Sequence, residues 1–354
     1  MTVGISRITD SLLFKIFYQL CERGPLSLRH LLFVSRRFHS VVVNNKHLWT
    51  TISIDPLFFH RFSQRPEQGD KYIEHCLTLS GSLPLRLHLD YSDTTVFDLA
   101  FLRHPLETFW KLGRRGFQRC TSLMWNADSY GATTIQRFAD LLPKSLPSLT
   151  HISITGFEDP FYGSRFPNCP WLKRVEMLSH RTPSDFWGTN FQNVTTLSFG
   201  EFDYWADCDL DTLSLFPVLR DLKLFSLRRA PALDSDNPHL PITLEHLHIF
   251  RAHGYIPPAV LIKLVVPALE ELHLKANYDG ITSIEALQRT FSPPCEHIYA
   301  LLPEAVSARE PEWATDLSKL VRRCTRTRSL YISKWMEKEY QTFMSGDGVV
   351  LHVQ

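Results

Sequence analysis

The chain has 354 residues, of which 44% are hydrophobic and 21% charged, and its formal net charge is +1. This length predicts more than one folding unit, and this composition predicts a packed core. The near-neutral charge argues against nucleic acid as the main partner, and no apolar run is long enough to suggest a membrane partner. Seven scattered cysteines without a C-x-x-C pair, and no signal-peptide pattern at the N-terminus, predict an intracellular protein of the cytoplasm or nucleus.

The first fifty residues show the spacing of three short amphipathic helices. Thr9 is a candidate N-cap of the first helix, Gly24-Pro25 ends it, and Ser27 is a candidate N-cap of the second. A third helix is expected from about Arg36 to Val43. The apolar residues of the first helix recur on one stripe, which comprises Ile8, Leu12, Leu13, Ile16, Phe17 and Leu20. So small a unit buries too little surface to be stable alone, so we expect it to complete its core on a partner protein.

Residues 51–80 are expected to connect this module to the rest of the chain. Pro56, Pro66 and Gly69 lie in the middle of this segment, and residues of these types commonly interrupt helices and strands. The sequence therefore predicts a loop over residues 56–70.

A pattern of apolar residues with the spacing apolar-x-x-apolar-x-apolar recurs after residue 81. The first residues of six successive copies lie 22 to 25 positions apart by subtraction, within the period of leucine-rich repeats. The copies are Leu149-Ile152-Ile154, Leu172-Val175-Met177, Val194-Leu197-Phe199, Leu219-Leu222-Leu224, Leu244-Leu247-Ile249 and Leu269-Leu272-Leu274. Weaker copies are Leu85-Leu87, Leu123-Trp125, Ile298-Ala300 and Leu330-Ile332. Each copy predicts a strand that is stable only when it stacks on its neighbours.

Of the six copies, that of Leu269 has the asparagine, Asn277, that closes the turn of a regular repeat. The repeats are therefore degenerate. Helical spacing of apolar residues between Glu310 and Cys324 predicts a helix before the last strand. The predicted fold is α/β: a three-helix module over residues 5–50, a connecting segment over 51–80, and a degenerate leucine-rich-repeat solenoid over 81–354. We expect the solenoid to have a curved parallel sheet and to end in a helix and a strand.

Polar residues between the apolar positions of the repeats define a candidate target-binding face. Alternate residues of a strand share one face of a sheet, so two columns of polar side chains should lie on the concave side. These residues are Arg174, Glu176, Asp221, Lys223, His246, His248, Glu271 and His273. The three histidines and Glu271 could cluster as zinc ligands, but the sequence provides no supporting residues around them, so ordinary polar surface is the favoured interpretation. No catalytic motif is present, so we predict no catalytic residue, no metal, no cofactor and no enzymatic activity.

The N-terminal fifty residues resemble the F-box. The family pattern opens with Leu-Pro and a Leu-x-x-Ile-Phe helix, continues with Val-Cys-Arg-x-Trp and closes with Leu-Trp. The matching residues are Ile8, Leu13, Ile16, Phe17, the segment from Val34 to Phe38, and Leu48-Trp49. Thr9, Ser35 and Phe38 stand where the family has Pro, Cys and Trp. The junction at residues 48–55 and 80–87 is similar to that of fungal F-box proteins with degenerate leucine-rich repeats.

This resemblance implies a substrate-recognition adaptor of a Skp–cullin–F-box ubiquitin ligase. The module would bind the Skp-type adaptor and through it a cullin, while the repeats present an unknown target protein. The resemblance implies an adaptor-binding face of Ile8, Leu12, Leu13, Ile16, Phe17, Leu31, Val34, Arg37 and Phe38. Trp49 would lock the module to the first repeat. The alternative is an F-box interaction protein that binds the adaptor without a cullin.

Overall fold

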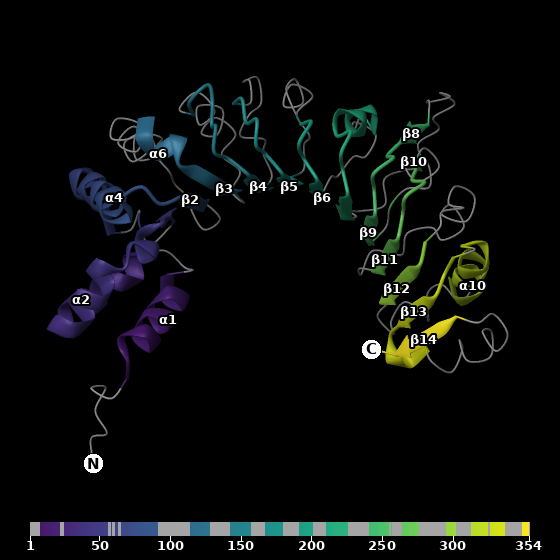
Figure 1. The fold of residues 1–354 in the computed structure, drawn as a ribbon, viewed down its shortest axis with the longest axis horizontal. Coiled ribbons are helices and arrows are strands. Elements are labelled where there is room, and N and C mark those ends of the chain that lie inside the picture. Colours follow the sequence, from purple (N-terminus) through teal and green to yellow (C-terminus); the bar gives the residue numbers. More distant parts are fainter. Residues whose placement is uncertain are drawn as a thin grey trace, which may run out of the picture. The chain divides into compact units, whose positions relative to one another are not determined.

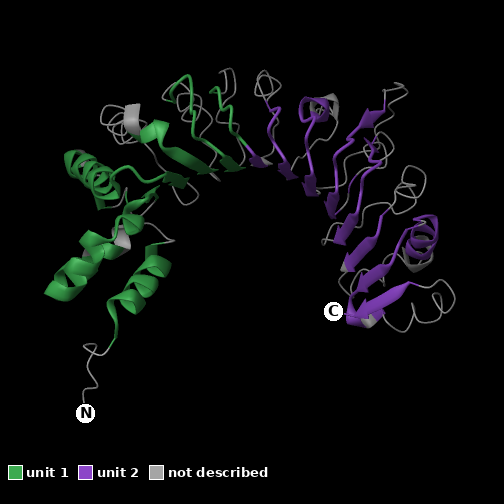
Figure 2. Ribbon diagram, viewed as in Figure 1, with its two compact units in different colours: residues 1–172 green, residues 173–354 purple. Residues whose placement is uncertain are grey.

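The computed structural model describes most of the chain and divides it into two compact units, residues 1–172 and residues 173–354 (Figure 2). Figure 1 labels their helices and strands. The described residues are 8–21, 25–55, 58, 61–62, 65–90, 114–127, 142–156, 167–179, 191–200, 210–225, 241–254, 256, 264–275, 295–301, 313–324, 326–336 and 349–353.

The first unit begins with two α-helices, α1 (Asp10–Cys21) and α2 (Arg36–Asn44), near the positions predicted. Thr9 caps α1, because its Oγ1 accepts a hydrogen bond from the backbone N–H of Leu12 at 3.3 Å. Ser35 caps α2 in the same way, accepting from the N–H of Phe38 at 3.1 Å. The side chains of Leu13, Phe17 and Cys21 are buried along one side of α1.

The segment between α1 and α2 differs from the prediction. It is a 3-10 helix, η2 (Pro25–Phe33), which begins at Pro25, so the position of Ser27 is inside the helix and not at its N-cap. Proline suits a first helical position because its fixed φ fits the helix and its missing N–H would be unpaired there. A second 3-10 helix, η3 (Lys46–Trp49), follows α2 and buries Leu48 and Trp49.

The predicted loop over residues 56–70 is wrong for its second part, because helix α4 (Pro66–Ser80) begins at Pro66. Gly69 does not break this helix. A Cβ at Gly69 would lie 3.1 Å from Cζ of Phe58, so the glycine allows the Phe58 ring to pack against the helix. Gly81, with φ of 61°, ends the helix. Pro66 therefore begins a helix, and Gly69 leaves room for a packing contact. Rules that consider only the local sequence predict a loop from the same two residues.

The sheet of the first unit begins earlier than the repeat pattern predicted. Its four strands are parallel and follow one another in chain order. They are β1 (Thr51–Ile54), β2 (Leu85–Asp90), β3 (Cys120–Ala127) and β4 (His151–Gly156), with a short helix α6 (Arg114–Gln118) before β3. Strand β1 lies in the segment interpreted as a connection, and it pairs with β2 from Thr51↔Arg86 to Ile54↔Leu89.

The second unit contains a parallel sheet of eight strands, also paired in chain order. They are β5 (Arg174–Ser179), β6 (Thr196–Gly200), β7 (Asp221–Phe225), β9 (Ile249–His253), β11 (Glu271–Lys275), β12 (His297–Leu301), β13 (Ser329–Ile332) and β14 (Val350–Val353). Its other elements are the helices η5 (Leu210–Leu215), α10 (Trp313–Arg323) and η7 (Lys334–Met336), and the two-stranded sheet of β8 (Ile242–Thr243) and β10 (Leu264–Val265). The predicted C-terminal helix is confirmed as α10.

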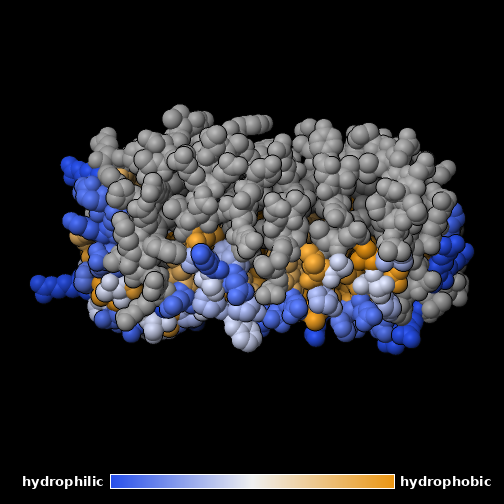
Figure 3. Space-filling view, turned by 90° about the horizontal axis from the view of Figure 1, so that it is seen from above, coloured by the Kyte–Doolittle hydropathy of each residue, from blue (hydrophilic) through white to orange (hydrophobic). Residues whose placement is uncertain are grey.

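Twelve strands of the two units therefore belong to parallel ladders, and the chain is α/β with few helices, as predicted. Alternation explains the core: Leu222 and Leu224 of β7 are buried, and so are Leu272 and Leu274 of β11, while the residues between them are not. Where described residues are visible in Figure 3, hydrophobic and hydrophilic residues are interspersed.

The predicted register of the fifth repeat copy is wrong. Strand β9 aligns Phe250, not Leu247, with Leu222 of β7 and with Leu272 of β11. The copy is therefore Leu247-Phe250-Ala252, three residues later than predicted, and all three side chains are fully buried. Leu247 can be the second apolar residue of a copy that begins at Leu244 or the first residue of a copy that begins at Leu247. The even spacing of 25 residues between copies favoured the one that begins at Leu244. The structure instead inserts β8 before this copy and lengthens the preceding connection.

The six described cysteines, Cys21, Cys76, Cys120, Cys169, Cys295 and Cys324, are buried free thiols. Burial raises the pKa of Cys76 and of Cys120 to about 12, so these thiols stay protonated and unreactive at neutral pH. Within the part of the chain that the structure describes, no helix is long and apolar enough to cross a membrane.

Candidate functional surfaces

Helix α1 carries an exposed apolar stripe beside its buried one. Leu12, Ile16 and Leu20 are spaced four residues apart and are 48%, 41% and 44% exposed. Phe33, the last residue of η2, and Val34, which follows it, are exposed as well, and η2 packs against α1. We call these five residues the helix face. Large apolar side chains gathered on a short helical segment are typical of a surface that a partner covers.

The residues predicted to bind the adaptor divide between this face and the module's own core. Leu12, Ile16 and Val34 are exposed on the helix face, whereas Ile8 and Leu31 are half-buried. Leu13 and Phe17 are buried, and the Phe17 ring meets the Phe38 ring edge to face at 5.1 Å. Leu13 and Phe17 each follow an exposed residue of the stripe, Leu12 or Ile16, by one position. On a helix this step places their side chains toward the core of the module. Leu20 and Phe33 belong to the face but were missing from the predicted set, although Leu20 already lay on the predicted stripe.

Arg37 holds the start of α1 against α2. Its guanidinium pairs with Asp10, with Nη2 at 2.7 Å from Oδ1, and also donates to the carbonyl oxygen of Ile8. The arginine therefore has an internal structural role in this chain. It fixes the end of the helix whose exposed stripe forms the helix face.

The second surface is the polar face of the sheet in the second unit. Paired residues of adjacent strands form two rows, which we call together the sheet face. The first row runs Arg174, Thr196, Asp221, Ile249, Glu271, His297, Ser329 and Val350. The second row runs Glu176, Ser198, Lys223, Arg251, His273, Tyr299, Tyr331 and His352.

Six of the eight predicted target-binding residues lie in these rows, and the two histidines of the fifth copy do not. With the corrected register, Ile249 and Arg251 occupy the places assigned to His246 and His248. His246 lies in the turn before β9, and His248 lies one residue before the strand with Nδ1 at 3.0 Å from Oε1 of Glu270. The histidine cluster considered as a zinc site is therefore not formed, and the described residues contain no group of three potential metal ligands.

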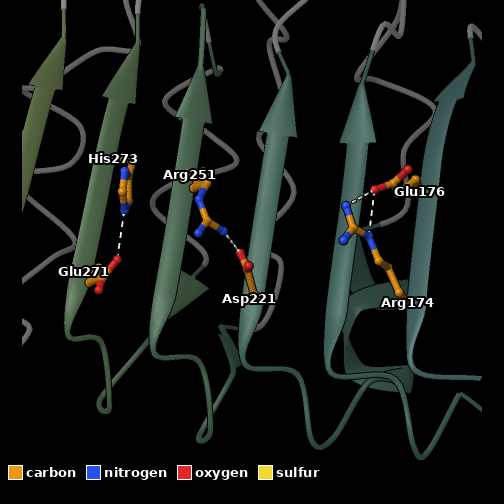
Figure 4. Close-up of polar contacts among 6 residues, drawn as sticks. All are labelled: Arg174, Glu176, Asp221, Arg251, Glu271 and His273. Atoms are coloured by element: carbon orange, nitrogen blue, oxygen red, sulfur yellow. Dashed lines mark hydrogen bonds and ion pairs between the residues drawn. The ribbon is translucent and has the colours of Figure 1, made fainter. Parts of the chain in front are cut away.

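The charged side chains of the sheet face are arranged in pairs (Figure 4). Nε of Arg174 donates to Glu176 at 2.7 Å on the same strand, and Nε2 of His273 lies 3.0 Å from Glu271. Arg251 pairs diagonally with Asp221 of the neighbouring strand. Each pair brings a carboxylate next to a basic side chain.

Lys223 and His253 lie where positive charges gather. Nζ of Lys223 lies 4.1 Å from the ring centroid of Phe225, and the same ring meets His253 edge-on at 5.1 Å. Burial, and then the nearby cations beginning with Lys223 and Lys275, lower the pKa of His253 to about 4. His253 is therefore neutral at physiological pH. Burial lowers the pKa of Lys223 as well, and Arg251 adds to this effect.

Beyond Arg251 the second row becomes a ladder of stacked rings. The His273 and Tyr299 rings are 4.2 Å apart at 4°, Tyr299 and Tyr331 4.3 Å apart at 8°, and Tyr331 and His352 4.4 Å apart at 12°. Alignment of the weak copies Ile298-Ala300 and Leu330-Ile332 with the others would have placed both tyrosines beside His273. His352 lies on β14, which matches none of the copies recognised in the sequence.

The sheet face thus offers paired charges and ring edges in fixed rows, which suits binding through shape and hydrogen bonds. No protein-family model matches this chain, and no curated protein sequence matches it. A crystal structure of a protein from Bacteroides fragilis is similar in part, with 15% identity and a TM-score of 0.30 over 67% of this chain and 74% of that chain.

Proposed function

We propose that the chain is a non-catalytic substrate-recognition subunit of a Skp–cullin–F-box ubiquitin ligase. In this proposal residues 8–49 are an F-box that docks a Skp-type adaptor. The strands and their return segments are a degenerate leucine-rich-repeat solenoid that presents a target protein. The subunit acts by raising the effective concentration of the target near the charged conjugating enzyme.

The observation that carries the proposal is the exposed stripe of Leu12, Ile16 and Leu20 beside a buried stripe on one short helix. The buried stripe is used by the module itself, so the exposed stripe is available to a partner. Because less than half of each residue is still exposed, covering it would contribute about 0.6–1.4 kcal/mol for each residue. The F-box resemblance of the same residues supports a Skp-type adaptor as that partner.

The sheet face supports the target-binding half of the proposal. Its side chains come from successive strands at fixed spacing, so a partner would meet a rigid, pre-organised surface. Arg251, Tyr299 and Tyr331 join the predicted residues there, since they lie in the same row as Lys223 and His273. Arginine and tyrosine are also residue types that often dominate binding energy at interfaces.

Co-purification tests the proposal and separates it from the alternative. The tagged full chain would be expressed with a Skp-type adaptor and a cullin, and the proteins retained with it would be identified. Recovery of both partners is the expected result. Recovery of the adaptor without the cullin would identify an F-box protein outside the ligase, and recovery of neither would overturn the F-box assignment.

A further inference from the structure

Among the residues that the structure describes, strand β14 leaves the core of the second unit open at one edge. It is the last strand in the sheet order, and none of its four residues is buried. Leu351 and Val353 are in register with Leu330 and Ile332 of β13, which are fully buried. Val353 is nevertheless 41% exposed. The apolar column that is covered on every inner strand is therefore uncovered here.

The backbone of β14 is open at the same edge. The N–H of Val350 donates to the carbonyl oxygen of Arg328 at 2.9 Å, on the β13 side. Backbone groups of alternate residues in a strand point to opposite edges, so those of Leu351 and Val353 point away from β13. No strand among the described residues pairs with this edge. Unpaired edges of this kind readily accept another strand.

The ring ladder ends at this edge as well. One face of the His352 ring stacks on Tyr331 at 4.4 Å, a separation close to the spacing of neighbouring strands. The other face is turned toward the open edge. A further strand would therefore extend three features at once: the backbone ladder, the apolar column and the stack of rings.

We propose that the edge of β14 binds a second copy of this chain through antiparallel pairing of the two β14 strands about a twofold axis. In this register Leu351 exchanges backbone hydrogen bonds with the partner's Val353, and Val353 with the partner's Leu351. His352 then lies opposite the partner's His352 as a non-hydrogen-bonded pair, in which side chains approach most closely. The two stacks become one ladder of eight rings on one face, and the half-buried Leu351 and the exposed Val353 meet on the other.

The charge pattern of the edge favours a second copy over a different partner. The segment Val349-Val350-Leu351-His352-Val353 contains no lysine, arginine, aspartate or glutamate. Natural edges that must stay free often carry such charges or a proline. Symmetric pairing in this register opposes His352 with His352 and Leu351 with Val353, so no lysine, arginine or carboxylate meets its like. A C2 contact of this kind is self-complementary and closes, so it gives a dimer without further growth. The inference does not depend on the proposed ubiquitin-ligase function.

Sedimentation velocity of the full chain, fused at its N-terminus to a monomeric solubility protein, tests the inference over a concentration series. The wild type is expected to show a monomer–dimer equilibrium. Val353→Pro removes an N–H on the open edge while leaving the N–H groups that face β13, and it should raise the dimer dissociation constant about tenfold or more. Val353→Thr keeps the N–H and the β-branch but exchanges a methyl group of the apolar contact for a hydroxyl, so it should weaken the dimer less than Val353→Pro does. A wild type that stays monomeric at all concentrations would overturn the inference.

Charge rescue tests the register. His352→Glu and His352→Lys each place like charges opposite each other in a homodimer, so each should dimerise more weakly than the wild type, by about twofold to fivefold. An equimolar mixture should restore dimers, because each glutamate then faces a lysine. Chains with different tags allow the mixed dimer to be captured and counted. Failure of the mixture to form mixed dimers above the level of either variant with itself would contradict the proposed pairing.

Discussion

Trp49 donates a hydrogen bond from Nε1 to the carbonyl oxygen of Val42 at 2.9 Å, and its ring lies edge-on to His75 at 5.4 Å. The first contact reaches back into α2 and the second reaches forward to α4. One buried side chain therefore joins the N-terminal helices to the helix that precedes β2. The resemblance led us to expect that Trp49 would lock the module to the first repeat, and the contact found here is instead with α4, in the segment predicted as a connection.

Replacement of Trp49 should destabilise the first unit strongly. Trp49→Ala removes a fully buried ring and leaves the Val42 carbonyl without its donor, so we expect a loss of about 3–5 kcal/mol in the free energy of unfolding. Trp171, which is 61% exposed in the same unit, is the matched control. Trp171→Ala should change stability by about 0.5 kcal/mol or less in urea denaturation. Equal losses for the two variants would show that Trp49 does not have this role.

The register of β9 predicts different costs for two neighbouring residues. Phe250→Ala removes a fully buried ring and should cost about 3–5 kcal/mol. Ile249→Ala removes a half-exposed side chain from the sheet face and should cost about 1 kcal/mol or less. Urea denaturation of both variants measures the difference. The frame predicted from sequence, in which Ile249 is the buried residue, requires the opposite order.

The fifth repeat copy shows why the sequence predicted the existence of the strands better than the residue-by-residue alignment between neighbouring strands. The apolar pattern located β4 to β7 and β11, because each has one clear frame of buried residues such as Leu222 and Leu224. In the fifth copy Leu247 satisfies two frames, and pairing with neighbouring strands decides between them. Ile249 looks more like a core residue than Ala252, but only a small side chain is buried at position 252.

Local rules also failed where tertiary packing overrides them. Pro66 and Gly69 predicted a loop, and yet they begin and shape α4 because Phe58 approaches the helix at the glycine. Strands β1 and β14 are each four residues long and lie outside the repeat copies recognised in the sequence. The helix face was predicted in its spacing, but the choice between inward and outward residues within the stripe depends on η2 and α2, which pack against α1.

His253 predicts a loss of stability at mildly acidic pH. Its pKa is about 4 in the folded chain, below the ordinary value of about 6.5 expected when unfolded. Between these values the unfolded state binds a proton that the folded state does not. The contribution of His253 is therefore fully present above about pH 6.5 and is lost as the pH falls toward 4.

Urea midpoints at pH 7.5 and pH 5 measure this loss. His253→Gln cannot be protonated, so its midpoint should fall less between the two pH values than that of the wild type. His47, an exposed histidine of the other unit, provides the control, and His47→Gln should keep the wild-type pH dependence. Equal pH dependence of the wild type and His253→Gln would contradict the environment described for His253.

The ion pair between Asp221 and Arg251 should contribute modestly to stability. Both side chains are about three-quarters buried, at 24% and 28% exposure, so the pair is more than a fully solvated contact. A double-mutant cycle with Asp221→Asn and Arg251→Gln should give a coupling energy of about 0.5–1 kcal/mol. The coupling should decrease in about 1 M salt. A coupling of zero at low salt would mean that the two charges do not interact across β7 and β9.

The most direct test of the proposed function is the affinity of the helix face for a Skp-type adaptor, measured by isothermal titration calorimetry on Ile16→Asp and Ser11→Asp. Ile16→Asp places a carboxylate on the stripe that the adaptor would desolvate, which costs several kcal/mol. Ser11→Asp adds the same charge at an exposed position of α1 outside the stripe. Circular dichroism would establish that both variants fold. We predict that Ile16→Asp weakens binding by about a hundredfold or more while Ser11→Asp binds like the wild type. Wild-type affinity in a folded Ile16→Asp variant would contradict the proposal that this face docks the adaptor.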